Sequence, residues 1–404
     1  MDLEFGASYE ELRAEARRFC AESWPLAGDE AALPDRERAR LWRERAIAAG
    51  FLHRTVPGAY GGGGMEADIL AETVIREELD AAGVPHRASV QGTHMLVPTL
   101  LECGTEEQRQ TYIRRTLTGE LRWCQGYSEP GSGSDLASLQ SRAVLEGDEW
   151  VINGQKIWTT QATEAEMMFG LFRTEPEQPK HGGISYLLLS MDTPGLDVRP
   201  LKMMQGGDDF CEVFFNDVRV PAANIVGKRG EGWKVSRSTL KHERMLIGDS
   251  TGARIGFDGV VALAKRSVRD GRPAIEDPHI RQRLAELEGY VTAREWSVAR
   301  IISAIAQDQD MKAMEDLLMA KIASTNVTQL TAKLAIDLLG DRGLDEPSGD
   351  ALVMGLRTHD DPGWVSQYMT SLSGAIAGGS SNIQRNIIGE RIYGLPRDQR
   401  PPGH

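Results

Sequence analysis

The sequence predicts an α+β protein with a β-domain between two helical regions. Apolar residues recur at helical spacing before about residue 120 and again after residue 231. Between them lie short apolar runs separated by Gly, Pro, Asn and Asp, as expected for strands and turns. We therefore divide the chain into an N-terminal α-helical domain at 1–121, a middle β-domain at 122–228 and a C-terminal helical domain at 229–404.

The N-terminal region carries the start and stop signals of helices. Leu12, Ala16 and Phe19 follow one another at intervals of four and three residues, which places them on one helical face. The glycine-rich run at 57–64 predicts a loop between helices. Thr105 precedes two glutamates and is expected to be the N-cap of another helix.

The middle region reads as a small β-domain. Its apolar runs lie at 150–152, 167–172, 185–189 and 213–215. Gly147-Asp148 and Asn153-Gly154 flank the first of these runs, and both dipeptides are typical of hairpin turns. We expect a hairpin turn at each of them.

The C-terminal region predicts four long helices. Its periodic segments run over about 233–269, 277–306, 310–339 and 361–390. Four such helices in succession favour an antiparallel bundle. The proline-rich end of the chain, at 396–404, is expected to be extended.

Composition excludes several classes of function. A net charge of −13 argues against a nucleic-acid partner, which requires clustered Lys and Arg. No run approaches the ~20 apolar residues of a membrane span, so we expect no membrane insertion. The acidic N-terminus, Met1-Asp2-Leu3-Glu4, lacks a signal pattern and predicts a cytoplasmic protein. The four cysteines include no Cys-x-x-Cys pair, and we expect no metal.

Two polar segments of the middle region are the best candidates for a binding site. Residues 127–135 read Tyr-Ser-Glu-Pro-Gly-Ser-Gly-Ser-Asp, and such a loop can present backbone N–H groups and hydroxyls to a phosphate. Trp158-Thr159-Thr160 begins 23 residues after Asp135 and offers a flat face and donors to a planar ring. Taken alone, the loop could equally be a Gly/Ser-rich surface turn.

These two segments together resemble the flavin-binding signature of the acyl-CoA dehydrogenase family. Further segments that resemble the family lie at 104–108, 217–221, 230–233 and 383–388. The resemblance spans nearly the whole chain. It implies the acyl-CoA dehydrogenase fold, in which the N-terminal helical domain and middle β-domain are followed by a C-terminal four-helix bundle.

The resemblance also implies FAD as the cofactor and an acyl-CoA thioester as the substrate. It assigns cofactor binding to Gln125, Tyr127, Ser128, Gly133, Ser134, Trp158, Thr159, Thr160, Ser380 and Asn382. It assigns substrate binding to Ser134, Arg244 and Gly378. Trp158 stands where an indole packs against the flavin ring, and Ser128 replaces a commoner threonine while keeping the hydroxyl.

The position of the catalytic base departs from the commonest family pattern. Gly378 stands where many members carry a glutamate, so that base is absent. Other branches carry the base on a bundle helix before an arginine, and Glu243-Arg244 resembles that pattern. Helical spacing places Glu243 at the edge of the face shared by Leu240 and Ile247. We predict Glu243 as the base and Arg244 as its structural partner; a salt-bridged or solvated Glu243 is the alternative.

A second set of departures concerns the half of the FAD site that a neighbouring subunit contributes in family homotetramers. The family's Arg, Phe, Gln and Gly positions are occupied by Ser267, Asp270, Asp337 and Asp341. A carboxylate ~4 Å from a phosphate charge costs about 4 kcal/mol at an effective dielectric constant of ~20. We predict that a second homologous chain supplies this half in an α2β2 heterotetramer. The alternative is divergence in which Arg269 or Arg272 compensates.

The resemblance predicts α,β-dehydrogenation of an acyl-CoA to a trans-2-enoyl-CoA, in lipid or steroid side-chain β-oxidation. Electrons would pass to an electron-transfer flavoprotein. Two alternatives on the same fold are an acyl-CoA oxidase and a flavin monooxygenase. A third is a non-catalytic partner subunit, which Gly378 favours and Glu243 opposes.

Overall fold

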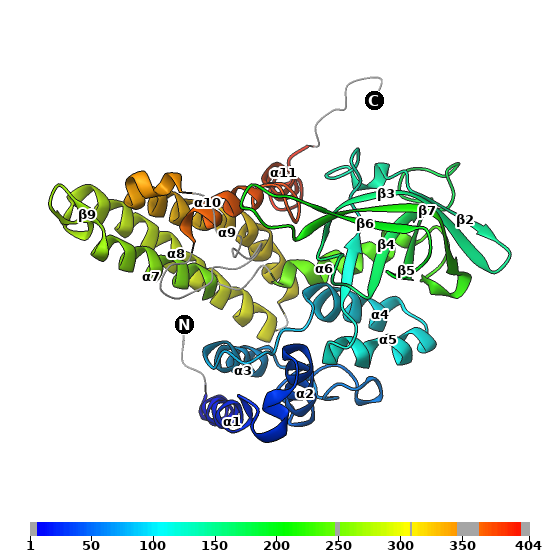
Figure 1. The fold of residues 1–404 in the computed structure, drawn as a ribbon, viewed down its shortest axis with the longest axis horizontal. Coiled ribbons are helices and arrows are strands. Elements are labelled where there is room, and N and C mark those ends of the chain that lie inside the picture. Colours follow the sequence, from blue (N-terminus) through cyan, green and yellow to red (C-terminus); the bar gives the residue numbers. More distant parts are fainter. Residues whose placement is uncertain (1–5, 247–250, 308, 346–362, 397–404) are drawn as a thin grey trace. The chain divides into compact units, whose positions relative to one another are not determined.

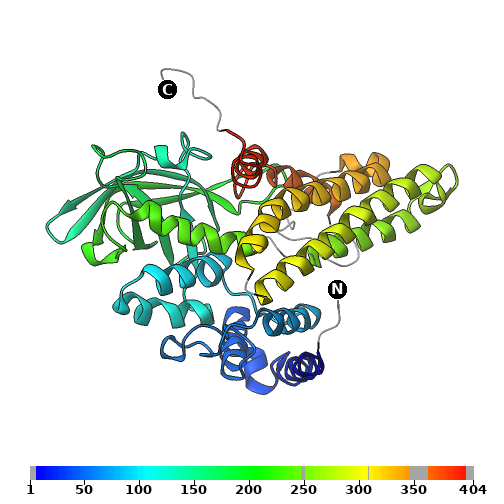
Figure 2. The same cartoon turned by 180° about the vertical axis from the view of Figure 1, so that it is seen from behind.

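The structure is a computed structural model of the 404-residue chain that describes residues 6–246, 251–307, 309–345 and 363–396. The chain forms two compact units. The first comprises residues 1–201 with 210–243, and the second comprises residues 202–209 with 244–404. Figures 1 and 2 show the helices and the sheet from opposite sides. The described elements confirm the α+β class.

The first unit begins with helices. They are α1 (Ala7–Ser23), α2 (Asp35–Ala48), α3 (Ile69–Ala81), α4 (Val97–Cys103) and α5 (Glu106–Thr118), with a π-helix at Gln91–Leu96 and short 3-10 turns at Gly28–Ala32 and Gly58–Tyr60. Thr105 caps α5 as predicted, because its side chain accepts from the Gln108 N–H while the Gln108 side chain accepts from the Thr105 N–H.

A mixed eight-stranded sheet follows in the same unit. Its strands are β1 (Trp123–Gly126), β2 (Arg142–Glu146), β3 (Glu149–Thr160), β4 (Met167–Arg173), β5 (Ile184–Ser190), β6 (Leu196–Leu201), β7 (Phe210–Pro221) and β8 (Ile225–Val226). Their order is β6-β7-β3-β2-β4-β5-β8, and β1 pairs in parallel with β4. The interiors of β4 and β5 are buried on both faces, which explains their unbroken apolar runs.

One of the two predicted hairpin turns is wrong. Gly147-Asp148 joins β2 to β3 as predicted. Asn153-Gly154 instead lies within β3, where the register against β7 shifts between Ile152 and Gly154. A Cβ on Gly154 would lie 2.4 Å from the Ser141 Oγ. The glycine therefore permits a bulge and a close approach rather than a turn.

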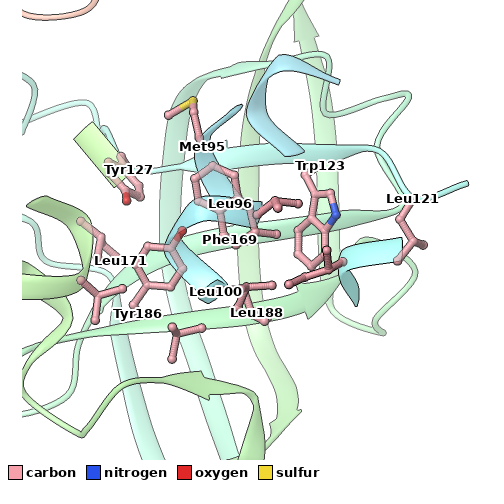
Figure 3. Close-up of a cluster of buried hydrophobic side chains, with 14 of the residues drawn as sticks. Met95, Leu96, Leu100, Leu121, Trp123, Tyr127, Phe169, Leu171, Tyr186 and Leu188 are labelled. Carbon is pink, nitrogen blue, oxygen red and sulfur yellow. The ribbon is translucent and has the colours of Figure 1, made fainter. Parts of the chain in front are cut away.

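Helix α6 (Gly232–Leu246) packs on the core of the first unit. Val235 belongs to the same buried cluster as Tyr127, and Leu240 contacts that cluster. Thr239 on α6 lies 2.9 Å, oxygen to oxygen, from Thr99 on α4. Figure 3 shows Tyr127, Phe169 and Tyr186 beside Leu96 and Leu100 in this cluster.

The second unit is helical. It contains α7 (Thr251–Arg266), α8 (Pro278–Ala306), α9 (Asp310–Leu339), α10 (Trp364–Ser373) and α11 (Ser381–Arg391), a two-stranded ribbon of β9 (Val268–Arg269) and β10 (Arg272–Pro273), and 3-10 turns at Ala274–Glu276 and Gly340–Leu344. Helices α7, α8 and α9 run side by side (Figures 1 and 2). Val260, Leu284, Leu334 and Trp364 belong to its buried core.

The predictions for α8 and α9 are confirmed to within one residue, whereas the last predicted bundle helix is wrong as a single helix. In the segment 233–269 the described residues form α6 and α7, and residues 247–250 between these helices, Ile247 among them, lie outside the described residues. The segment 361–390 breaks between α10 and α11, where Gly378 and Gly379 have φ angles of 62° and 85°. Left-handed glycines interrupt a helix at little steric cost. Most of the predicted tail, 397–404, also lies outside the description, and the domain boundaries stay predictions.

Candidate functional site

The loop after β1 is a closed turn. The backbone N–H of Glu129 donates to the Ser132 carbonyl at 2.9 Å, and the Ser132 N–H donates back at 3.0 Å. The Ser132 hydroxyl donates to the carbonyl of Asp135 at 3.0 Å. The chain then enters a short 3-10 turn at Leu136–Ser138. These bonds give the Pro-Gly-Ser segment a defined path.

A buried ion pair fastens this loop to β3. The Lys156 Nζ donates to Glu129 Oε1 at 2.8 Å and to the Tyr127 carbonyl at 3.2 Å. The same carboxylate accepts from the backbone N–H groups of Gln140 at 2.6 Å and Ser141 at 2.9 Å. The side chain of Lys156 is fully buried. Sequence reasoning missed both partners, although a lysine among the apolar residues of β3 was an available signal.

The electrostatics of the pair follow from burial and mutual attraction. Burial raises the pKa of Glu129, but Lys156 and the two backbone N–H groups outweigh it, so the net pKa is lowered. Burial lowers the pKa of Lys156 to about 8, against the attraction of Glu129. With the pKa of Glu129 lowered and that of Lys156 still about 8, both groups are charged at neutral pH. The loop is thus held by charge-assisted hydrogen bonds in a dry environment.

Trp158 is presented by a second irregularity of β3. The register against β7 shifts between Lys156 and Thr159, and Trp158 has a φ of 62°. The residue is 58% exposed, and its ring meets that of Phe210 edge-on with 6.0 Å between the ring centroids. A bulge re-aims a side chain, and a bulky residue with positive φ is uncommon enough to mark a functional position. The backbone conformation therefore keeps the indole exposed to solvent.

The predicted cofactor residues of the first unit differ in accessibility. Gln125, Ser128 and Thr160 are half-buried, and Gly133, Ser134 and Trp158 are exposed. Tyr127 and Thr159 are buried, so their side chains face the core. The Ile157 N–H donates to the Ser128 carbonyl at 3.0 Å, which ties this loop directly to the strand that carries Trp158.

These residues fit a flavin. An exposed flat indole stands on the same strand as the half-buried Thr160 hydroxyl, and a turn with exposed glycine and serine leads from Ser128. A ring system needs a flat apolar contact with donors near its polar edge, and a pyrophosphate needs accessible N–H and O–H groups. A separate polar cavity of about 370 Å³ lies beside the turn, lined among others by Ser132 and Gln140; no predicted site residue lines it.

Glu243 is the last residue of the first unit and lies on α6. It follows Leu240 by three residues and Thr239 by four, which places it on the helical face that bears these two residues. Its side chain and that of Arg244 lie outside the described side chains. The backbone therefore places the predicted base on a helix that packs on the core containing Tyr127.

Buried hydroxyl-bearing residues of the first unit come from α6, α4, β5 and the loop after β1. The rings of Tyr186 and Tyr127 meet edge-on with 6.3 Å between their centroids, and burial raises the pKa of Tyr186 well above its ordinary value. Thr239 on α6 is buried as well. Thr239 contacts Thr99. Sequence reasoning missed Tyr186, Thr239 and Thr99, because nothing in the sequence indicates which hydroxyl-bearing residues meet in a core.

The remaining predicted residues belong to the second unit. Gly378 has a left-handed φ of 62°, a conformation that disfavours any side chain there. The Ser380 hydroxyl caps α11 by accepting from the Ile383 N–H at 3.3 Å, so it already has a structural role. Asn382 is exposed on the first turn of α11.

Three of the four unusual positions of the second unit, and one of the arginines that could compensate for them, lie in different surroundings. Asp337 pairs with Arg283 at 2.6 Å, which compensates part of its charge and weakens the expected repulsion at that position. Asp270 occupies the β9–β10 turn with a φ of 49°. Asp341 is exposed in the 3-10 turn after α9. Arg269 lies 3.9 Å from Asp277.

Comparison with known proteins decides the family. Models described as the N-terminal, middle and C-terminal domains of acyl-CoA dehydrogenase match residues 7–120, 124–218 and 230–393. Acyl-CoA dehydrogenase IpdE1 of Mycobacterium tuberculosis is 37% identical, over 97% of this chain and 99% of that protein. The chain belongs to the acyl-CoA dehydrogenase family. It is accordingly an oxidoreductase that acts on CH–CH bonds, and members of its family are flavoproteins.

Solved acyl-CoA dehydrogenase structures are similar over the whole chain. The Tcur3481-Tcur3483 steroid ACAD has a TM-score of 0.77 and 30% identity, covering 98% of this chain and 100% of that one. The ChsE4-ChsE5 complex from Mycobacterium tuberculosis has a TM-score of 0.76 and 29% identity with the same coverage. In the described part of the chain, no helix is long and apolar enough to cross a membrane. No group of described side chains could hold a metal ion.

Proposed function

We propose that this acyl-CoA dehydrogenase oxidises an acyl-CoA thioester to a trans-2-enoyl-CoA with FAD as cofactor and Glu243 as base. The observation that carries the proposal is that α6 bears Glu243 and packs on the core that contains Tyr127, while Gly378 has no side chain and a left-handed φ. A carboxylate is thus available at one of the two positions where this family carries its base.

The residues of the chain would divide the work as follows. Ser128, Ser134 and Thr160 would hold FAD by hydrogen bonds, and Trp158 would cover the face of its ring. Glu243 would remove the proton from the carbon next to the thioester carbonyl, and desolvation by bound substrate would make it a stronger base. Bound FAD would supply the acceptor for the hydride that leaves the β-carbon. Gly378 would leave room for the substrate.

We also infer that the active assembly is an α2β2 heterotetramer with a second homologous chain. Ser267, Asp270 and Asp341 support this, because none of them is a cation that could hold a pyrophosphate. The similar structures named for two proteins, Tcur3481-Tcur3483 and ChsE4-ChsE5, support it further. By the same analogy, we propose a steroid side-chain thioester as substrate and an electron-transfer flavoprotein as electron acceptor.

Glu243→Gln tests the base. Replacing the carboxylate with an amide of the same shape should lower kcat by at least ~10³-fold, within the range of ~10²–10⁴ for general-base catalysis, and leave bound FAD unchanged. Turnover of acyl-CoA with a dye acceptor and the flavin absorbance give the two readouts. Glu231→Gln is the matched control, since Glu231 is exposed just before α6. Full activity of Glu243→Gln would locate the base elsewhere.

Two further measurements separate the alternatives. Peroxide release with oxygen consumption, in place of dye reduction, would indicate an oxidase.

The isolated chain should bind little FAD until a homologous partner is supplied. A homotetramer of this chain alone with one FAD per subunit and full turnover would reject the heteromer. A partner-dependent complex whose activity is indifferent to Glu243 would instead indicate a non-catalytic subunit, the reading that Gly378 favours.

A further inference from the structure

One face of α9 carries three hydrogen-bond donors at helical spacing. Lys321, Thr325 and Gln329 follow one another at intervals of four residues. The Lys321 Nζ donates to the carbonyls of Gly374 at 2.7 Å and Gly379 at 2.9 Å. Thr325 donates to Gly374 at 3.2 Å, and Gln329 donates to the Ser371 carbonyl at 3.2 Å. All of these acceptors lie at the end of α10 or in the segment that follows it.

Lys321 is an unusual member of this set because it is a buried cation. Its residue is 7% exposed, and burial lowers its pKa. Among the described residues no carboxylate forms an ion pair with it. A charged group is rarely buried without compensation. Here two backbone carbonyls provide that compensation, and the carbonyl at the end of α10 carries the negative end of the helix dipole.

The segment that Lys321 contacts needs such an anchor. Gly374, the C-cap of α10, and Gly379 lie five residues apart, and between them the chain enters a left-handed conformation at Gly378. The Gln384 side chain donates to the Gly378 carbonyl at 3.4 Å. A Cβ on Gly379 would lie 2.7 Å from that same side-chain nitrogen. Glycines carry a large entropy cost when they are fixed, so external hydrogen bonds determine the path of this loop.

We propose that Lys321 is a positioning residue that holds the 374–380 loop in the conformation that the cofactor and substrate site requires. The assignment rests on the proposed function, in which Gly378 leaves room for the substrate. Lys321 acts through its two carbonyl contacts. It bridges the end of α10 and the residue before the α11 cap, and thereby fixes the position from which α11 begins.

Three variants of the holoenzyme, prepared with its partner chain where one is required, test the assignment. Lys321→Met removes the charge and all donors while keeping the length of the side chain. Lys321→Arg restores a cation with several donors. Lys333→Met makes the same change at an exposed position of α9 and serves as the control. Amide hydrogen exchange of residues 374–384, FAD content, kcat and KM are measured for each.

We expect Lys321→Met to accelerate exchange in 374–384 by at least tenfold, with a matching loss of FAD or of kcat. Lys321→Arg should recover part of the slow exchange and part of the lost FAD or kcat. Lys333→Met should leave the exchange rate, the FAD content and kcat unchanged. Unaltered exchange in Lys321→Met would overturn the loop assignment. Accelerated exchange with unchanged FAD content and kinetics would overturn its role in the site. If the parent protein neither binds FAD nor oxidises any acyl-CoA, the proposed function fails, and the exchange rates alone decide whether Lys321 holds the loop.

Discussion

Two loops of this acyl-CoA dehydrogenase are each fastened by one buried lysine, but the two lysines are compensated differently. In the first unit, Lys156 faces the carboxylate of Glu129, and that carboxylate also accepts two backbone N–H groups. In the second unit, Lys321 faces two backbone carbonyls and pairs with no carboxylate of the described residues. The 127–135 loop therefore depends on a charge pair, and the 374–380 loop depends on backbone dipoles.

This difference predicts how much stability is lost when the lysine of each loop is removed. Removing one member of a buried ion pair leaves the other charge without a partner, which costs more than the pair itself contributes. Removing a cation that is held by carbonyls leaves only neutral acceptors unsatisfied, and these cost about 1–3 kcal/mol each. Replacing Lys156 with an apolar residue should thus lower the free energy of unfolding more than the same replacement of Lys321.

The largest effect is expected for Lys156→Met. The buried Glu129 carboxylate would lose its cation, and the free energy of unfolding should fall by about 3–5 kcal/mol. Urea denaturation followed by circular dichroism measures the change. Lys180→Met removes a neighbouring surface pair, Lys180–Asp135 at 2.7 Å, and should cost under ~1 kcal/mol. Equal losses in the two variants would contradict a special role for the buried pair.

The next largest loss of stability is expected for Glu129→Gln, which removes the negative charge but keeps the size and shape of the side chain. The pKa of Glu129 is lowered from its ordinary 4.5 on folding. Its contribution to stability is therefore present above pH 4.5 and is lost as the pH falls through the lower, folded-state value. The parent should lose stability in acid more steeply than Glu129→Gln, and the two curves should converge at low pH. Parallel acid profiles would show that Glu129 is not the charged partner.

Gly378→Ala should have a smaller effect on the 374–380 loop. A Cβ at a φ of 62° costs about 1–2 kcal/mol, because the left-handed region brings Cβ close to the following carbonyl oxygen. Gly289→Ala in α8 is the matched control, since Gly289 is exposed and an added Cβ meets nothing within 4 Å. That change should stabilise the protein by up to ~1 kcal/mol. Thermal unfolding distinguishes the two signs.

The smallest effect on stability is expected for Asp337→Asn. Its partner Arg283 and Asp337 itself are both partly exposed, and such pairs contribute under ~1 kcal/mol. Melting temperatures should therefore change little. If Asp337 disfavours FAD in a homomer, the isolated variant should bind more FAD than the isolated parent. An unchanged FAD content would show that Asp337 does not support the heteromer hypothesis.

The periodic and local features of the chain could be predicted from the sequence. Helices α8 and α9, the Thr105 cap and the Gly147-Asp148 turn all depend on residues close together in the chain. The Asn153-Gly154 turn could not be predicted correctly, because the approach of Ser141 and pairing with β7 override the local turn preference. The break in the last predicted helix was also missed: it lies at Gly378 and Gly379, which have left-handed φ angles, in the loop that Lys321 contacts.

The sequence by itself determined the α+β order, the flavin-type segments and the absence of a glutamate at position 378, since these depend on residue types at fixed spacings. Only the tertiary structure decided that Lys156 meets Glu129, that a bulge presents Trp158 and that Lys321 meets Gly374 and Gly379. Each of these contacts joins residues that are distant in the chain or depends on strand register. Neither property is encoded in local spacing, because partners across a fold are selected by packing.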